Sequence, residues 1–123
     1  MAKKILVVDD SKTALMMERE ILEKRKNYHC VTAADGQEAV EKAQQERPDL
    51  VLMDVVMPRM NGFEACKAMR QQDGTRETPI VLVTTRSEES YMEAGFQSGC
   101  NDYITKPVDG AELVALLQSY LGE

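Results

Sequence analysis

The chain has 123 residues, of which 43% are hydrophobic and 29% charged, a balance typical of one globular domain that needs no disulfide to hold its core. Its formal net charge of −6 argues against nucleic-acid binding as the main activity. No apolar stretch approaches the length of a membrane span and no signal peptide is recognisable, so we expect a cytoplasmic protein without membrane insertion.

Five short apolar runs divide the chain, and each precedes a segment whose apolar residues have helical spacing. Near-continuous runs of Val, Ile and Leu are typical of strands buried on both faces of a parallel sheet. The alternation of strand and helix predicts a doubly wound α/β sheet with helices on both faces. We expect a single domain over residues 1–123, without an output domain. The predicted strands cover residues 5–8, 30–33, 50–53, 80–83 and 103–105.

Capping residues mark the predicted helices in chain order. Ser11 suits the N-cap of the first helix and Asp35 that of the second. Asn61 opens the third helix, which Gly74 is expected to close, and a weaker fourth helix is predicted over 88–98. The stripes expected to face the core are Leu15, Met16, Ile21 and Leu22 in the first helix, Ala39, Val40 and Ala43 in the second, Phe63, Cys66 and Met69 in the third, and Leu113, Leu116, Leu117 and Leu121 in the fifth.

Polar residues stand at the ends of four predicted strands. Asp9 and Asp10 follow the first strand, Asp54 the third, Thr84 the fourth and Lys106 the fifth. The carboxyl ends of parallel strands share one edge of the sheet, where open α/β folds bind their ligands. If the first and third strands are neighbours, the three carboxylates converge.

Such a group of residues suits phosphoryl chemistry. Three carboxylates in one pocket repel each other, so a proton or a cation must accompany them. Mg²⁺ fits because it prefers hard oxygen ligands and keeps waters that a phosphate can replace. Lys106 adds a positive charge and Thr84 a hydroxyl donor, and the Asp54 carboxylate would be the nucleophile.

Each of these residues has a simpler structural interpretation when taken alone. An Asp after a strand is usually a helix cap or a turn residue. A Lys before Pro at a sheet edge is usually a solvated charge. The joint pattern of acidic pair, single Asp, hydroxyl and lysine, each after its own strand, favours a functional site.

Four motifs recur in order across the whole chain: VVDDS at 7–11, LMDVVMP at 52–58 with NG at 61–62, VTT at 83–85 and YITKP at 103–107. With these motifs the chain resembles response-regulator receiver domains of two-component signalling, of the stand-alone chemotaxis-regulator type. The resemblance implies a flavodoxin-like (βα)5 sheet with strand order 2-1-3-4-5. It also implies a phosphorylation-dependent switch that controls chemotaxis or motility.

The resemblance assigns the acidic residues to a metal and phosphoryl site. Asp54 would accept a phosphoryl group from a sensor histidine kinase. Asp10 and Asp54 would bind Mg²⁺ directly, together with the backbone carbonyl of Val56. Asp9 would hold the same metal through water.

The resemblance also assigns the remaining motif residues to the switch. Lys106 would pair with the phosphoryl group, and the bond between Lys106 and Pro107 is expected to be cis. Thr84 would move toward the phosphoryl group and Tyr103 would follow it inward. The surface of the fourth helix, fifth strand and fifth helix would then repack and bind a downstream protein, with the receiver a monomer or weak dimer.

Three positions depart from the usual family residues or lie where the family varies. An apolar Val56 cannot orient a water, so we predict slow self-dephosphorylation. Thr85 stands where a small residue is usual and is expected to narrow access to the phosphoryl group. Arg86 lies at a position that tunes dephosphorylation.

Other function classes fit the sequence less well. A phosphatase with an aspartyl nucleophile needs a second acid two residues after it, where Val56 stands, so we expect no enzyme in the usual sense. A binding module independent of phosphorylation would not need the intact set of Asp10, Asp54, Thr84 and Lys106. A nucleotide-binding fold is disfavoured because no Gly-x-Gly-x-x-Gly or Gly-Lys-Ser/Thr run occurs.

Overall fold

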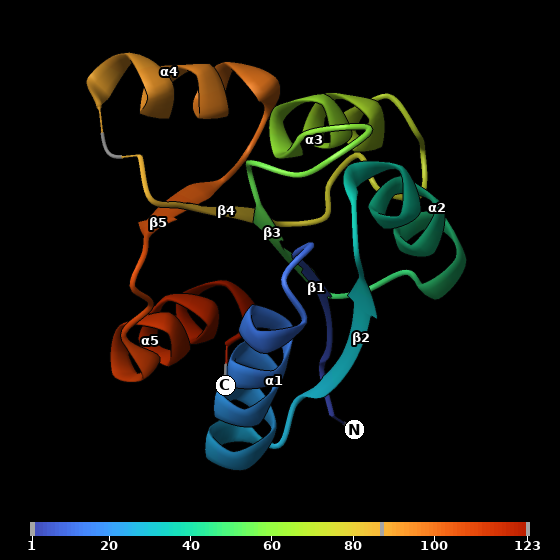
Figure 1. Cartoon of the computed structure of the whole chain (residues 1–123). Coiled ribbons are helices and arrows are strands. Elements are labelled where there is room, and N and C mark those ends of the chain that lie inside the picture. Colours follow the sequence, from blue (N-terminus) through green and yellow to red (C-terminus); the bar gives the residue numbers. More distant parts are fainter. Residues whose placement is uncertain (1, 87, 123) are drawn as a thin grey trace.

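The centre of the molecule is one sheet of five parallel strands: β1 (Lys4–Val8), β2 (His29–Ala33), β3 (Leu50–Asp54), β4 (Ile80–Thr84) and β5 (Asp102–Thr105). Their order across the sheet is β2-β1-β3-β4-β5, as expected (Figure 1). The structure is a computed structural model that describes residues 2–86 and 88–122. Every pairing in the sheet is parallel, so all five carboxyl ends meet at one edge.

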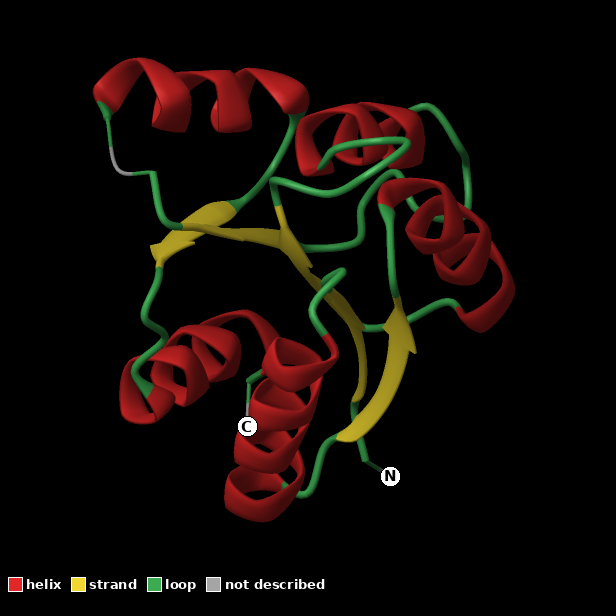
Figure 2. Ribbon diagram, viewed as in Figure 1, coloured by secondary structure: helices red, strands yellow, loops and turns green. Residues whose placement is uncertain are grey.

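Within residues 2–86 and 88–122, five helices cover both faces of this sheet. Helices α1 (Lys12–Lys26) and α5 (Gly110–Leu121) lie on one face. Helices α2 (Gly36–Glu46), α3 (Gly62–Arg70) and α4 (Glu89–Ser98) lie on the other. Figure 2 shows the resulting three layers, with the strands between two sets of helices. The doubly wound α/β prediction is therefore confirmed.

Alternating strand residues build a separate core on each face. Ile5 and Val7 pack with Leu113 and Leu117 on the side of α1 and α5. Leu6 and its neighbours in β3 and β4 pack on the side of α2 and α3. Successive side chains of a strand point to opposite faces, so strands covered on both sides must be apolar throughout. This requirement explains the continuous apolar runs in the sequence.

The predicted helix starts agree with the structure, whereas the end of the third helix does not. The side chains of Ser11, Asp35 and Asn61 each accept a hydrogen bond from a backbone N–H in the first turn of their helix. Helix α3 ends at Arg70, well before Gly74, where the N–H groups of Gln71 and Gln72 donate to carbonyl oxygens three residues back. The Arg70 guanidinium binds carbonyl oxygens of the loop that follows. A Cβ at Gly74 would lie 2.5 Å from the guanidinium carbon of Arg47, the far end of an exposed and flexible side chain that can move aside.

The core-facing stripe of α1 also differs from the prediction. Met16 is 71% exposed, whereas Leu22 is completely buried and Glu18 is only 5% exposed. Positions 15, 18 and 22 are spaced by three and four residues and therefore share one face of the helix, which Met16 does not. Glu18 thus occupies a position that an apolar residue would normally fill.

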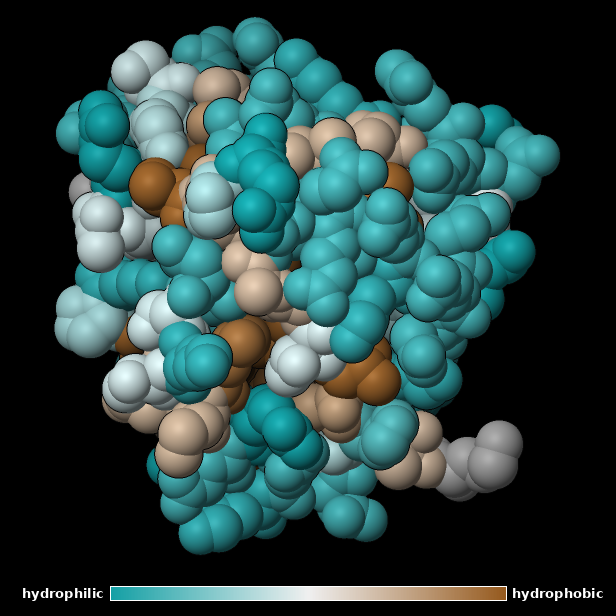
Figure 3. All heavy atoms as spheres, turned by 45° about the vertical axis from the view of Figure 1, so that its right-hand side comes forward, coloured by the Kyte–Doolittle hydropathy of each residue, from teal (hydrophilic) through white to brown (hydrophobic). Residues whose placement is uncertain are grey.

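The outer surface is largely polar. In the space-filling view, hydrophilic side chains cover most of the visible face, and hydrophobic atoms show only in small separate patches (Figure 3). Over residues 2–86 and 88–122, none of the helices has the length and apolar character needed to cross a membrane.

Candidate functional site

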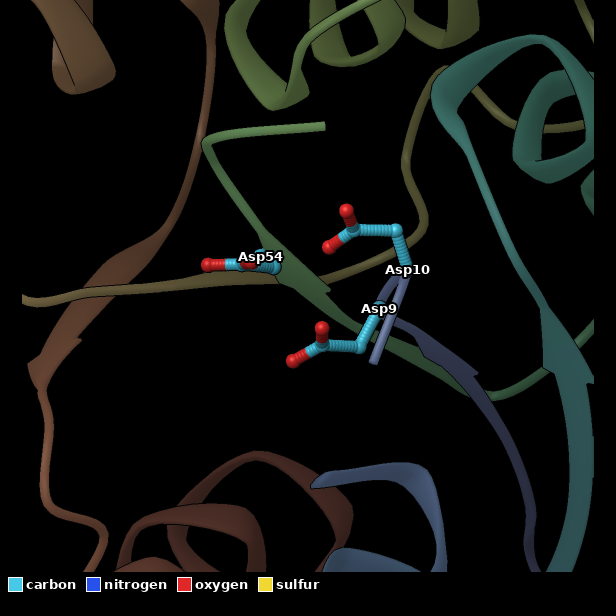
Figure 4. Close-up of side chains that lie close together, drawn as sticks. All are labelled: Asp9, Asp10 and Asp54. Atoms are coloured by element: carbon cyan, nitrogen blue, oxygen red, sulfur yellow. The ribbon is translucent and has the colours of Figure 1, made fainter. Parts of the chain in front are cut away.

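Three aspartates meet at the carboxyl edge of the sheet. Asp9 and Asp10 follow β1, and Asp54 is the last residue of β3, the strand paired with β1. One carboxylate oxygen from each lies within 4.8 Å of the others. Figure 4 shows the three side chains projecting into the same space above the ends of the two strands. Asp9 and Asp54 are buried and Asp10 is exposed, so the group opens to solvent on one side.

Backbone groups hold these carboxylates in place. Asp9 accepts a hydrogen bond from the N–H of Ser11 at 2.9 Å, and Asp54 accepts one from the N–H of Val55 at 3.0 Å. Gly62 lets the first turn of α3 approach, since a Cβ there would lie 2.6 Å from the carbonyl oxygen of Asp54. Gly62 is therefore a packing requirement of the site, whereas Asn61 caps α3.

Lys106 supplies the positive charge that the sequence predicted. Its Nζ donates a hydrogen bond to Asp9 Oδ2 at 3.1 Å and lies 3.6 Å from Asp54 Oδ1. Lys106 follows β5, the edge strand that β3 and β4 separate from β1. The peptide bond between Lys106 and Pro107 is cis. One ammonium group therefore faces several carboxylates.

The resulting electrostatics disfavour ionisation of Asp54 in the absence of a metal. Burial, and then the charges of Asp9 and Asp10, raise the pKa of Asp54 to about 6, although Lys106 and the Val55 N–H act in the opposite direction. A further cation would restore the ionised carboxylate. The donor set consists of carboxylate oxygens around one opening, which is the chemistry that Mg²⁺ requires.

The two threonines after Val83 have different environments. Thr84 ends β4 and is 1% exposed, and its Oγ1 accepts a hydrogen bond from the Arg86 N–H at 3.2 Å. Thr85 is exposed. Asp54 pairs in register with Val83, so Thr84 lies one residue beyond the strand neighbour of Asp54. Alternation along the strand thus presents one hydroxyl to the buried side of this edge.

Tyr103 lies between the edge of the sheet and α4. Its hydroxyl donates a hydrogen bond to the Arg86 carbonyl oxygen at 3.1 Å, and its ring would be 3.2 Å from a Cβ at Gly95. Burial, and then neighbouring Tyr91, raise the pKa of Tyr103 to about 12, so the hydroxyl stays a donor. The backbone of Arg86 therefore connects the Thr84 hydroxyl to the Tyr103 hydroxyl.

Glu18 is a fourth carboxyl group near the site, and the sequence did not identify it. It lies on α1, faces Lys106 and Pro107 across a cavity of about 190 Å³, and forms no hydrogen bond or ion pair within the described chain. Burial, and then Asp9, raise its pKa to about 7. The available signal was its spacing, since an acidic residue between Leu15 and Leu22 falls on a core-facing stripe.

Val56 lies two residues after Asp54, in the loop that follows β3, and its side chain is 64% exposed. The structure thus brings Asp9, Asp10, Asp54 and Lys106 together. Thr84 stands at the same edge, and Tyr103 is connected to it through Arg86.

Comparison with known proteins places this site in context. Residues 5–118 match the family described as the response regulator receiver domain. The chain is 41% identical over 121 residues to the alkaline phosphatase synthesis transcriptional regulatory protein PhoP of Bacillus subtilis, covering 98% of this chain but 49% of PhoP. It is 39% identical over 118 residues to protein PilH of Pseudomonas aeruginosa, covering 96% of this chain and 97% of PilH.

Solved structures give the same result. The chemotaxis protein CheY4 of Vibrio cholerae matches with a TM-score of 0.92 and 38% identity over 98% of this chain and 99% of CheY4. The receiver domain of the sensor histidine kinase PA1611 of Pseudomonas aeruginosa matches with a TM-score of 0.92 and 32% identity over all of both chains. The PA1611 domain holds a magnesium ion in its active site cleft.

Proposed function

The chain belongs to the family of response regulator receiver domains of two-component signalling, and on that premise we propose that Asp54 accepts a phosphoryl group from a sensor histidine kinase. Receiver domains are signalling proteins and not enzymes in the usual sense. The single observation that carries the proposal is the meeting of Asp9, Asp10, Asp54 and Lys106 at one edge of the sheet.

Asp54 would act as the nucleophile of the transfer. A carboxylate oxygen attacks the phosphorus of a phosphohistidine, a new O–P bond forms, and the N–P bond breaks with its electron pair returning to the imidazole. Asp54 is held for this attack by the Val55 N–H and by its place at the rigid end of β3. It must be ionised, and added positive charge would favour this by lowering the pKa of Asp54 from its raised value of about 6.

Asp9, Asp10, Asp54 and the backbone carbonyl of Val56 would hold Mg²⁺, with Asp9 acting through water. The bound ion supplies positive charge that offsets repulsion among the carboxylates and between Asp54 and the incoming phosphoryl oxygens. Lys106 already lies within 3.6 Å of Asp54, so it can pair with a phosphoryl oxygen after a small movement.

Thr84 and Tyr103 would transmit the change to the surface. In the structure, the Arg86 N–H donates a hydrogen bond to Thr84 Oγ1 at 3.2 Å. When Thr84 instead donates a hydrogen bond to a phosphoryl oxygen, its Oγ1 would move away from this N–H. The Arg86 carbonyl oxygen also accepts a hydrogen bond from the Tyr103 hydroxyl. A shift of the Arg86 backbone would therefore break this bond and allow Tyr103 to turn inward. Because the Tyr103 ring packs against Gly95, this movement changes the packing of α4.

The output would pass through a protein that binds the surface of α4, β5 and α5. CheY4 is a chemotaxis protein, and PilH is a relative of nearly equal length, so control of chemotaxis or motility is the pathway we propose. The exposed, apolar Val56 offers no group that orients a water, and we propose a slow loss of the phosphoryl group.

Phosphorylation with a small donor tests the proposal. The protein is incubated with acetyl phosphate and Mg²⁺, and intact mass is measured for the natural chain, for Asp54→Asn and for Asp49→Asn, an exposed aspartate before β3. We expect one added phosphoryl group in the natural chain and in Asp49→Asn, and none in Asp54→Asn. Equal labelling of all three proteins would refute the assignment of Asp54.

A further inference from the structure

The negative charge of the chain is concentrated in its last third. Residues 88–122 contain six acidic residues and one lysine, a net charge of −5, whereas the whole chain carries −6. That lysine is Lys106, whose ammonium group is already bound to Asp9 and Asp54. The surface formed by α4, β5 and α5 therefore presents acidic groups without a free cation among its described residues. The acidic residues are Glu88, Glu89, Glu93, Asp102, Asp109 and Glu112.

On α4 these charges flank an apolar groove. A hollow of about 440 Å³ is lined by Glu89, Met92, Glu93 and Phe96. These positions are spaced by three and four residues, so they share one face of the helix. Phe96, which is 48% exposed, is the one aromatic residue among the large exposed apolar side chains of the described residues. Two apolar side chains with a carboxylate beside each form a surface suited to binding a partner.

The carboxylates of this groove are available for such a partner. Within residues 88–122, neither Glu89 nor Glu93 forms an ion pair. Arg86, which precedes α4 in the sequence, is engaged elsewhere: its Nε lies 3.0 Å from a carboxylate oxygen of Glu88, and its guanidinium carbon lies 4.6 Å from the centre of the Tyr91 ring. The groove thus lacks a compensating charge of its own.

We propose that this α4 groove binds a basic amphipathic segment of a partner protein, with apolar side chains on Met92 and Phe96 and lysine or arginine side chains on Glu89 and Glu93. Charge complementarity selects this occupant. A second copy of the chain would bring the same carboxylates face to face, and the phosphates of a nucleic acid would be repelled in the same way. A basic segment instead gains long-range attraction during its approach.

The inference rests on the proposed switch, because it names the partner of the same surface. The groove lies on the helix that packs against Tyr103 through Gly95, where the Cβ of a larger residue would be 3.2 Å from the ring. A movement of Tyr103 therefore reaches the helix that carries Met92 and Phe96. Binding of the basic segment would depend on the state of Asp54.

Two synthetic peptides test the charge preference. Both carry leucine at helical spacing, and one has lysine where the other has glutamate. Binding is measured by fluorescence anisotropy at several NaCl concentrations, before and after treatment with acetyl phosphate and Mg²⁺. We expect the lysine peptide to bind and to weaken with salt, and the glutamate peptide not to bind.

Matched variants separate the groove from general attraction to an acidic protein. In Glu89→Gln/Glu93→Gln we expect binding of the lysine peptide to weaken by about tenfold. The control Glu41→Gln/Glu77→Gln removes the same charge from exposed positions elsewhere and should leave affinity within about twofold. Phe96→Ser should weaken binding without changing its salt dependence. Circular dichroism verifies that each variant keeps its helices.

The outcomes distinguish this inference from the proposed function. If acetyl phosphate labels Asp54 but both peptides bind alike, or both double variants behave alike, the inference is overturned and the phosphoacceptor role stands. If the lysine peptide binds as described but Asp54 is never labelled, the proposed switch fails while the groove retains its partner chemistry. Self-association that is lost in the groove variant would identify a second copy as the occupant and would also overturn the inference.

Discussion

The charged groups at the carboxyl ends of the strands and those at the amino ends have opposite kinds of environment. At the carboxyl edge, Asp9, Asp10, Asp54 and Glu18 lie around one ammonium group among the described residues, that of Lys106, and the pKa values of Asp54 and Glu18 are raised. At the amino edge, the guanidinium of Arg70 donates to five oxygens that lie before and beside β4 and β5. These acceptors are the carbonyl oxygens of Thr75, Arg76, Thr78 and Gly99 and the side-chain oxygen of Asn101.

This difference in charge balance distinguishes groups that stabilise the fold from groups that can bind a ligand. Arg70 has its donors satisfied by neutral oxygens, so the arrangement is complete and stabilises the loops it joins. The carboxyl edge keeps an excess of negative charge, which disfavours the folded state until a cation or a proton arrives. Changes at Arg70 should therefore alter stability, whereas changes at the carboxyl edge should alter binding and pH dependence.

The largest effect on stability is expected for Arg70→Ala. The substitution removes the Arg70 donor from the partly buried carbonyl oxygens of Thr78 and Gly99, and we expect the free energy of unfolding in urea to fall by about 2–4 kcal/mol. The control Arg76→Ala removes an exposed arginine paired with Asp73 and should change it by less than about 0.5 kcal/mol. Equal losses in the two variants would contradict the structural role of Arg70.

Glu18→Gln should stabilise the protein in a pH-dependent way. The pKa of Glu18 is raised from 4.5 to about 7 on folding. Between pH 4.5 and pH 7, Glu18 is therefore protonated in the folded state and ionised in the unfolded state. Stability from this group is therefore present at low pH and is lost as pH rises through 7. We expect the advantage of Gln over Glu to grow by about 2 kcal/mol between pH 5 and pH 8.

Urea unfolding at both pH values measures this difference, with Glu41→Gln at an exposed site of α2 as the control. The difference in the free energy of unfolding between Glu41→Gln and the natural chain should change little with pH. An advantage of Glu18→Gln that stays constant from pH 5 to pH 8 would mean that Glu18 is not buried near the other carboxylates.

Lys106→Met should strengthen metal binding. Without the ammonium group, the carboxylates lose the only cation within 4 Å of them among the described residues, so they attract Mg²⁺ more strongly. We expect the dissociation constant, measured by calorimetry at pH 8, to fall by about tenfold, or about 1.4 kcal/mol. Lys67→Met, on the exposed side of α3, should leave it nearly unchanged. Weaker binding in Lys106→Met would show that Lys106 is required to build the metal site.

The smallest effect is expected at Val56. An amide in Val56→Asn can orient a water toward the phosphoryl group, so its lifetime should shorten several-fold, which corresponds to less than about 1.4 kcal/mol. Loss of the added mass over time measures this lifetime after acetyl phosphate is removed. Met16→Asn, at an exposed position of α1, is the control. A lifetime of only seconds in the natural chain at saturating Mg²⁺ would contradict the proposed role of Val56.

Sequence patterns predicted the parts of the molecule that depend on local periodicity. Continuous apolar runs required strands covered on both faces, and parallel pairing then brought Asp9, Asp10 and Asp54 to one edge. The pattern did not predict the Arg70 network, because Asn101 is 31 residues away and its position depends on how α3 and β5 pack. Glu18 was missed for a related reason, since its burial follows from the packing of α1 against the Lys106 loop.

Chemical mapping of the phosphorylated residue tests the central claim most directly. Borohydride reduces an aspartyl phosphate to homoserine, and mass spectrometry of the digested protein then locates the reduced residue. The account predicts homoserine at position 54 after treatment with acetyl phosphate and Mg²⁺, and none when the metal is chelated. Homoserine at position 9 or 10, or none at all in a phosphorylated sample, would contradict it.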